Sequence, residues 1–79
     1  MRIYVRAKTL IDDKFTVTYS NHYQREDPEE LSYIDEFISE MIKDIPVYLI
    51  HSMMHSVTTI TFTFGVETHS IKVKLNDYR

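Results

Sequence analysis

Apolar and polar side chains alternate at both ends of the chain. Residues 2–10 place apolar side chains at every second position between charged side chains and Tyr4, and residues 15–20 alternate again, with threonine and serine as the polar residues. A period of two is typical of a strand with one buried face. The segment 11–14 between them, Ile-Asp-Asp-Lys, has the polar composition of a tight turn. The N-terminal part of the sequence therefore predicts a β-hairpin.

The C-terminal part predicts a second hairpin. Residues 58–64 alternate threonine with Ile60, Phe62 and Phe64, and residues 69–75 again alternate apolar with polar side chains. The only glycine of the chain, Gly65, lies between these two segments, where a turn is required.

A helix is predicted over residues 28–44. Asp27 is a good N-cap residue, and Pro28 suits the first helical position. The apolar residues that follow are spaced by three and four, as on one helix face; they are Leu31, Ile34, Phe37, Ile38, Met41, Ile42 and Ile45. Pro46 ends the helix, because the residue before a proline avoids helical geometry.

Residues 47–57 fit two interpretations. As a strand, this segment is apolar on both faces; as a helix, it carries an apolar stripe. We therefore expect a single α+β domain over residues 1–79: an antiparallel sheet of four or five strands, with one long amphipathic helix packed on it, in the order β-β-α-(β)-β-β.

The small size of the chain favours self-association. A domain of 79 residues without cysteine has a small core and no disulfides to support it. Because residues 47–57 carry more apolar surface than one helix covers, we expect a homodimer that hides this segment. The candidate interface residues are Tyr48, Ile50, Met53 and Met54.

No segment has the length and hydrophobicity of a membrane-spanning helix or of a signal peptide. We therefore expect no membrane association and a cytoplasmic location, in the host cell if the protein is viral.

Catalytic and metal-binding patterns are weak. His51 and His55, four residues apart, would share a helix face as zinc ligands often do. Without cysteine, further ligands would have to come from distant parts of the chain, so locally hydrogen-bonded histidines are the better interpretation. No nucleophile–base pair and no glycine-rich phosphate loop stand out. We expect neither an enzyme nor a cofactor.

Charge is unevenly distributed along the chain. Although the net charge is −3, the segment from Glu26 to Asp44 contains eight acidic residues and one basic residue, Lys43. On a helical wheel several carboxylates lie opposite or beside the apolar stripe. The candidate partner-binding residues are Glu26, Glu29, Asp35, Glu36, Glu40 and Asp44. Such a row is either a solvated helix face or a partial imitation of a phosphate backbone.

The basic residues predict no direct binding of nucleic acid. Arg2, Arg6, Lys8, Lys72 and Lys74, with Tyr4 among them, would form only a weak basic and aromatic sheet surface.

The small size, the lack of cysteine and the acidic segment from Glu26 to Asp44 resemble the small proteins with which bacterial viruses disable host factors, above all DNA-mimic inhibitors. That resemblance implies a basic, nucleic-acid-binding host protein as the partner, for example a histone-like nucleoid protein. The leading hypothesis is a homodimeric inhibitor or adaptor that uses its acidic helix face. The alternative is a structural or assembly component that binds through its sheet and residues 47–57.

Overall fold

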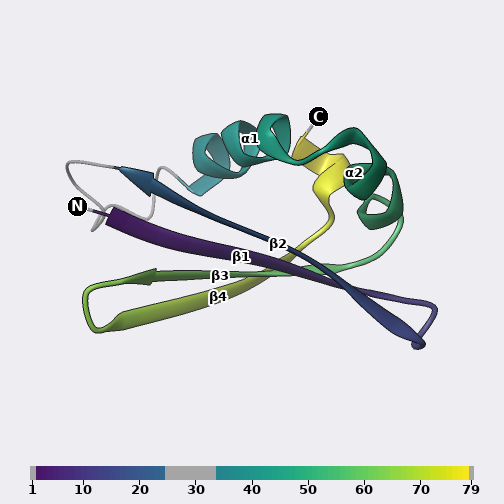
Figure 1. Cartoon of the computed structure of the whole chain (residues 1–79), viewed down its shortest axis with the longest axis horizontal. Helices are drawn as coiled ribbons and strands as arrows, with labels where there is room; N and C mark the ends of the chain where they lie inside the picture. The colour runs from purple at the N-terminus through teal and green to yellow at the C-terminus, as the bar shows by residue number, and fades with distance from the viewer. Residues whose placement is uncertain (1, 25–33, 79) are drawn as a thin grey trace.

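The computed structural model describes residues 2–24 and 34–78. Two β-hairpins flank two helices along the chain, and a short 3-10 helix follows the last strand (Figure 1). The elements are β1 (Arg2–Ile11), β2 (Phe15–Gln24), α1 (Ile34–Asp44), α2 (Val47–Met53), β3 (Thr58–Phe64), β4 (Glu67–Val73) and η2 (Leu75–Tyr78).

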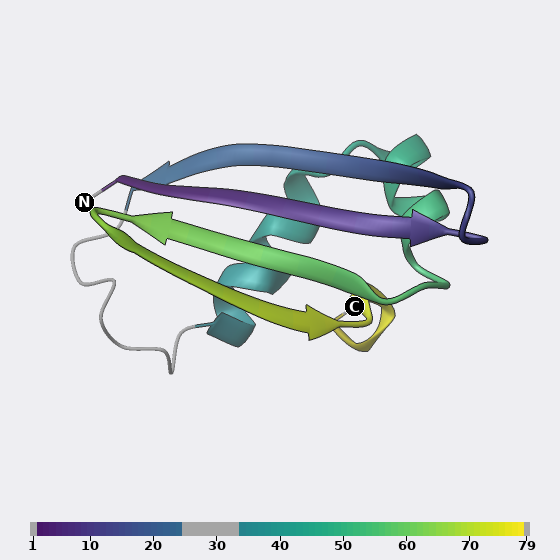
Figure 2. The ribbon, with the colours of Figure 1, turned by 90° about the horizontal axis from the view of Figure 1, so that it is seen from below.

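The four strands form one antiparallel sheet in the order β2-β1-β3-β4. The two hairpins join through β1 and β3, whose pairing runs from Tyr4↔Thr63 to Thr9↔Thr58. Both helices and η2 cover the same side of the sheet (Figure 1). Seen from the other side, the sheet has no described helix in front of it (Figure 2). The α+β architecture with an antiparallel sheet is thus confirmed, and so are both hairpins, although the last strand covers Glu67–Val73 and not the predicted residues 69–75.

The expectation of one long helix was wrong. The described helical segment before Pro46 is α1, of 11 residues, and it ends where the proline predicts; residues 28–33 of the predicted helix lie outside the described residues. The uncertain segment 47–57 begins as α2, of seven residues, and adds no fifth strand. Its spacing explains this choice, because Ile50, Met53 and Met54 are buried at the i, i+3, i+4 positions of one helix face.

The core lies between the helices and the inner face of the sheet. Aromatic rings connect three elements: Tyr23 of β2 meets Phe37 of α1 edge-on at 4.9 Å, and Phe37 meets Phe62 of β3 at 5.5 Å. Beside them Ile38 and Met41 are fully buried. This packing fixes α1 across the middle of the sheet.

A pair of threonines interrupts the apolar core. Thr9 and Thr58 are directly opposite each other on β1 and β3, both are fully buried, and their hydroxyl oxygens are 2.7 Å apart. Each hydroxyl supplies a partner for the other, so neither is buried without a hydrogen bond.

Both hairpins turn through residues with positive φ. In the first, the Lys14 amide donates to the Ile11 carbonyl at 3.0 Å, and the central residues Asp12 and Asp13 have φ of 51° and 57°, as in a type I′ turn. In the second, Gly65 has φ of 59° at the first central position, as in a type II′ turn.

Candidate functional site

The carboxylates of α1 are exposed, and two of them, Asp35 and Asp44, contact neighbouring elements. Asp35, Glu36, Glu40 and Asp44 are all exposed. Glu36, Glu40 and Asp44 follow each other at intervals of four residues, about 6 Å of helix rise, and we call these three residues the acidic row. The other two candidates, Glu26 and Glu29, lie outside the described residues.

Tyrosine hydroxyls hold two of the α1 carboxylates. The Tyr23 hydroxyl donates a hydrogen bond to Oδ2 of Asp44 at 2.9 Å. Burial, together with the hydrogen bonds to Asp44 and Tyr19, raises the pKa of Tyr23 well above its ordinary value. Burial and then the charge and hydrogen bond of Asp35 raise the pKa of Tyr78. Both ends of α1 are therefore tied to other elements by neutral donors, which leave the negative charge in place.

No sequence pattern identifies these tyrosines as partners of the acidic residues. The pairs Tyr23–Asp44 and Asp35–Tyr78 are more than 20 residues apart in the chain, and no local pattern connects them. Only the packing of α1 against β2 and η2 brings them together.

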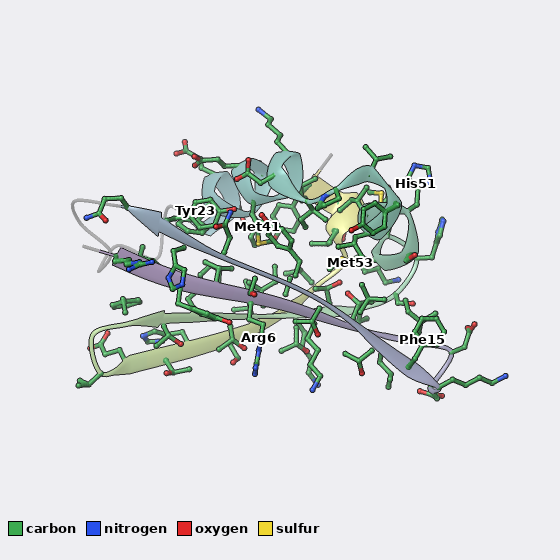
Figure 3. All side chains as sticks on the ribbon, viewed as in Figure 1. Arg6, Phe15, Tyr23, Met41, His51 and Met53 are labelled. Atoms are coloured by element: carbon green, nitrogen blue, oxygen red, sulfur yellow. The ribbon has the colours of Figure 1, made fainter. Side chains whose placement is uncertain are left out.

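Positive charge gathers on the opposite side of the molecule. Arg6 points away from the helices (Figure 3), and the strand register places three further cations on the same face. The exposed cations of this face are Arg2, Arg6, Lys8 and Lys72. Within the described part of the chain, Asp35, Glu36 and Asp44 form no ion pair with lysine or arginine. The protein thus presents opposite charges on its two layers.

Small hydroxyl side chains lie on the same face as these cations. The register places eight of them on the same face, on three strands: Thr16, Thr18, Ser20, Thr59, Thr61, Thr63, Thr68 and Ser70. Thr61 and Ser70 are hydrogen-bonded across β3 and β4 at 3.1 Å. Tyr4 adds an aromatic ring that meets the His22 ring edge-on at 4.9 Å. We call this surface, with its four cations, the open sheet face.

Three of the four candidate dimer-interface residues are not available to a partner. Ile50, Met53 and Met54 are buried in the hydrophobic core of the single chain and do not lie on its surface. The physical reason is that the apolar stripe of residues 47–57 completes the core of its own chain. Tyr48 is 74% exposed, beside Val47 at 71%.

The histidines do not gather. His51 is on α2, His55 follows it in a turn, His22 is on β2 and His69 is on β4. His69 stacks on Phe64 at 5.5 Å and contacts the Glu67 carboxylate at 3.4 Å. Among the described residues, no three potential ligands lie close enough together to hold a metal ion.

Of the helices in residues 2–24 and 34–78, none is long and apolar enough to cross a membrane. Comparisons with protein-family models, with curated proteins and with solved structures found no match to this chain.

Proposed function

We propose that this chain is a small non-enzymatic binding protein, an inhibitor or adaptor whose acidic row engages a basic, nucleic-acid-binding protein in the manner of a DNA mimic. The observation that carries the proposal is the separation of charge between the two layers. Glu36 and Asp44 are exposed on α1, while Arg6 points away from the helices (Figure 3) and the strand register places Arg2, Lys8 and Lys72 on the same face of the sheet as Arg6. Negative charge on one exposed ridge attracts a positive surface and orients its approach.

The anchoring of Asp44 supports this proposal. A carboxylate held by the Tyr23 hydroxyl at 2.9 Å keeps its charge in a fixed position. A binding surface with fixed charges loses less side-chain entropy when the complex forms.

Self-association belongs to the same proposal, and the edge strand β2 is the surface that favours it. β2 pairs with β1 and with no other strand among the described residues. It is ten residues long and contains no lysine, arginine, acidic residue or proline, the residues that commonly protect a sheet edge. One end already has a local partner, because the Asn21 side chain accepts a hydrogen bond from the His22 amide at 2.8 Å. The segment from Thr16 to Ser20 is then the pairing surface for a second copy.

A pull-down with purified, tagged protein from a cell lysate tests the proposed function. The bait is compared with the variant Glu36→Gln/Glu40→Gln, at about 50 mM and about 500 mM salt. We expect basic nucleic-acid-binding proteins to be retained at low salt, to be released at high salt and to be lost with the double variant. The control is Glu67→Gln, which removes an exposed carboxylate of β4 at the other layer.

Recovery of neutral or acidic partners alone, without sensitivity to salt, would contradict the proposal. Equal losses with Glu67→Gln and with the double variant would also contradict it, since the effect would then come from net charge and not from the acidic row.

A further inference from the structure

We infer that the open sheet face binds single-stranded RNA. Its four cations, Arg2, Arg6, Lys8 and Lys72, are all exposed. By strand register, no carboxylate lies on this face among the described residues, because Glu67 is opposite Phe64 on the inner face. The inference goes beyond the proposed function, which uses the opposite layer.

The cations are spaced across the face and not clustered at one point. Arg6 and Lys8 are two residues apart on β1, about 7 Å in an extended strand. Lys8 and Lys72 are both opposite Thr59, one on each side of β3, which separates them by about 10 Å. A polyanion that crosses the sheet therefore meets several cations in turn and releases counterions at each.

An aromatic group lies within this arrangement. Tyr4 is between Arg2 and Arg6 on β1, is half-buried, and is held edge-on against His22. Aromatic rings on basic surfaces supply stacking platforms for unpaired bases, with little dependence on sequence. A simple anion or an acidic protein needs no such ring, so its presence favours a nucleic acid.

The hydroxyls and the shape of the face favour a single strand of RNA. Threonine and serine hydroxyls both donate and accept hydrogen bonds, and the 2′-hydroxyl of ribose, which DNA lacks, does the same. The face is a sheet without a helix in front of it (Figure 2), whereas duplex DNA is commonly read by an element that enters a groove. An extended strand with splayed bases matches a broad sheet surface better.

This inference revises the expectation of no direct nucleic-acid binding. In the sequence the cations are divided between residues 2–8 and residue 72, and each group is too small to indicate a site. Pairing of β1 with β3, and of β3 with β4, brings them onto one surface.

The test is fluorescence anisotropy with a labelled oligouridine of about twelve nucleotides, titrated with the untagged protein. We expect a Kd of about 1–100 µM at low salt, and a slope of log K against log salt of about −2 to −3 for four neutralised phosphates. We expect Arg6→Ala/Lys8→Ala to weaken binding at least tenfold, and Tyr4→Ala about tenfold. The matched control Lys43→Ala, which removes an exposed cation of α1, should change the affinity less than twofold. Circular dichroism of each variant checks that it is folded.

Absence of RNA binding at low salt would overturn the inference, as would equal losses with Lys43→Ala and with Arg6→Ala/Lys8→Ala. Two further probes separate the alternatives. Equal affinity for oligothymidine would overturn the assignment to RNA, and equal affinity for polyglutamate would reduce the face to a general anion surface. If the protein self-associates and Arg6→Ala/Lys8→Ala abolishes this self-association, the open sheet face binds the acidic row of a second copy and not RNA. If the protein does not bind RNA, the result expected for the pull-down with the Glu36→Gln/Glu40→Gln variant does not change. The two proposals can therefore fail independently of each other.

Discussion

The Tyr23 hydroxyl and the Asp44 carboxylate, 2.9 Å apart, join the last residue of α1 to the end of β2. The Tyr23 ring also meets Phe37 edge-on at 4.9 Å. One side chain therefore fixes α1 through both an apolar contact and a polar one.

We expect Tyr23→Phe to lower the free energy of unfolding by about 1 kcal/mol. The ring contact with Phe37 survives, while a hydrogen bond to a charged group is lost at a partly exposed site. Chemical denaturation measures the effect. The matched control is Tyr48→Phe, at a residue that is 74% exposed, and it should change stability by less than about 0.5 kcal/mol. Equal effects of the two variants would contradict the role of the Tyr23–Asp44 hydrogen bond.

Stability should fall at alkaline pH. The fold raises the pKa of Tyr23 and of Tyr78, so above a pH of about 10, the ordinary tyrosine pKa, the unfolded chain loses protons that the folded chain retains. The tyrosine contribution is complete below that pH and is lost as the pH rises toward the folded-state values. Denaturation at several pH values measures this decline. We expect it to be shallower in Tyr23→Phe, and an identical decline would assign it to other groups.

The buried threonine pair should behave as a unit. Thr58→Val leaves the Thr9 hydroxyl buried without the partner that it has at 2.7 Å, and we expect a loss of about 1–3 kcal/mol. Thr9→Val/Thr58→Val removes both hydroxyls and should restore most of that stability. A double-mutant cycle by denaturation measures the coupling. Additive losses would show that the two hydroxyls do not depend on each other.

The turn between β3 and β4 needs glycine for its backbone conformation. Gly65 has φ of 59°, and a Cβ there would meet no atom within 4 Å, so the cost of Gly65→Ala comes from the backbone alone. We expect a loss of about 1–2 kcal/mol. The neighbouring Val66→Ala, at a fully exposed residue, is the control and should have little effect on the thermal midpoint. A tolerated Gly65→Ala would contradict the type II′ geometry.

The edge of β2 should control self-association. We expect sedimentation to detect a concentration-dependent dimer, and Thr18→Lys/Ser20→Lys to abolish it, because a lysine on an edge strand opposes pairing. The control Ser70→Lys alters an exposed hydroxyl of the other edge strand, β4, and should leave the dimer intact. A monomer at every concentration would remove the dimer from the proposed function.

Regular local patterns were enough to predict much of the fold. Alternation in residues 2–10 and 58–64 predicted β1 and β3, because a strand turns every second side chain to the same face. Pro46 predicted the end of α1. The segment after it was ambiguous in sequence, since a short apolar run fits a helix or a strand equally well, and burial of Ile50 and Met53 against the sheet decided for α2.

The sequence by itself determined which residue types carry charge and where the acidic segment lies along the chain. Tertiary structure alone decided which charges share a surface: it brought Lys72 onto the sheet face that carries the cations of β1, gave Asp44 a hydrogen-bond donor from β2, and buried Met53 and Met54 in the core. The physical reason is that strand pairing and helix packing join residues far apart in the chain. Local periodicity fixes the face on which a side chain lies but does not identify the element opposite it.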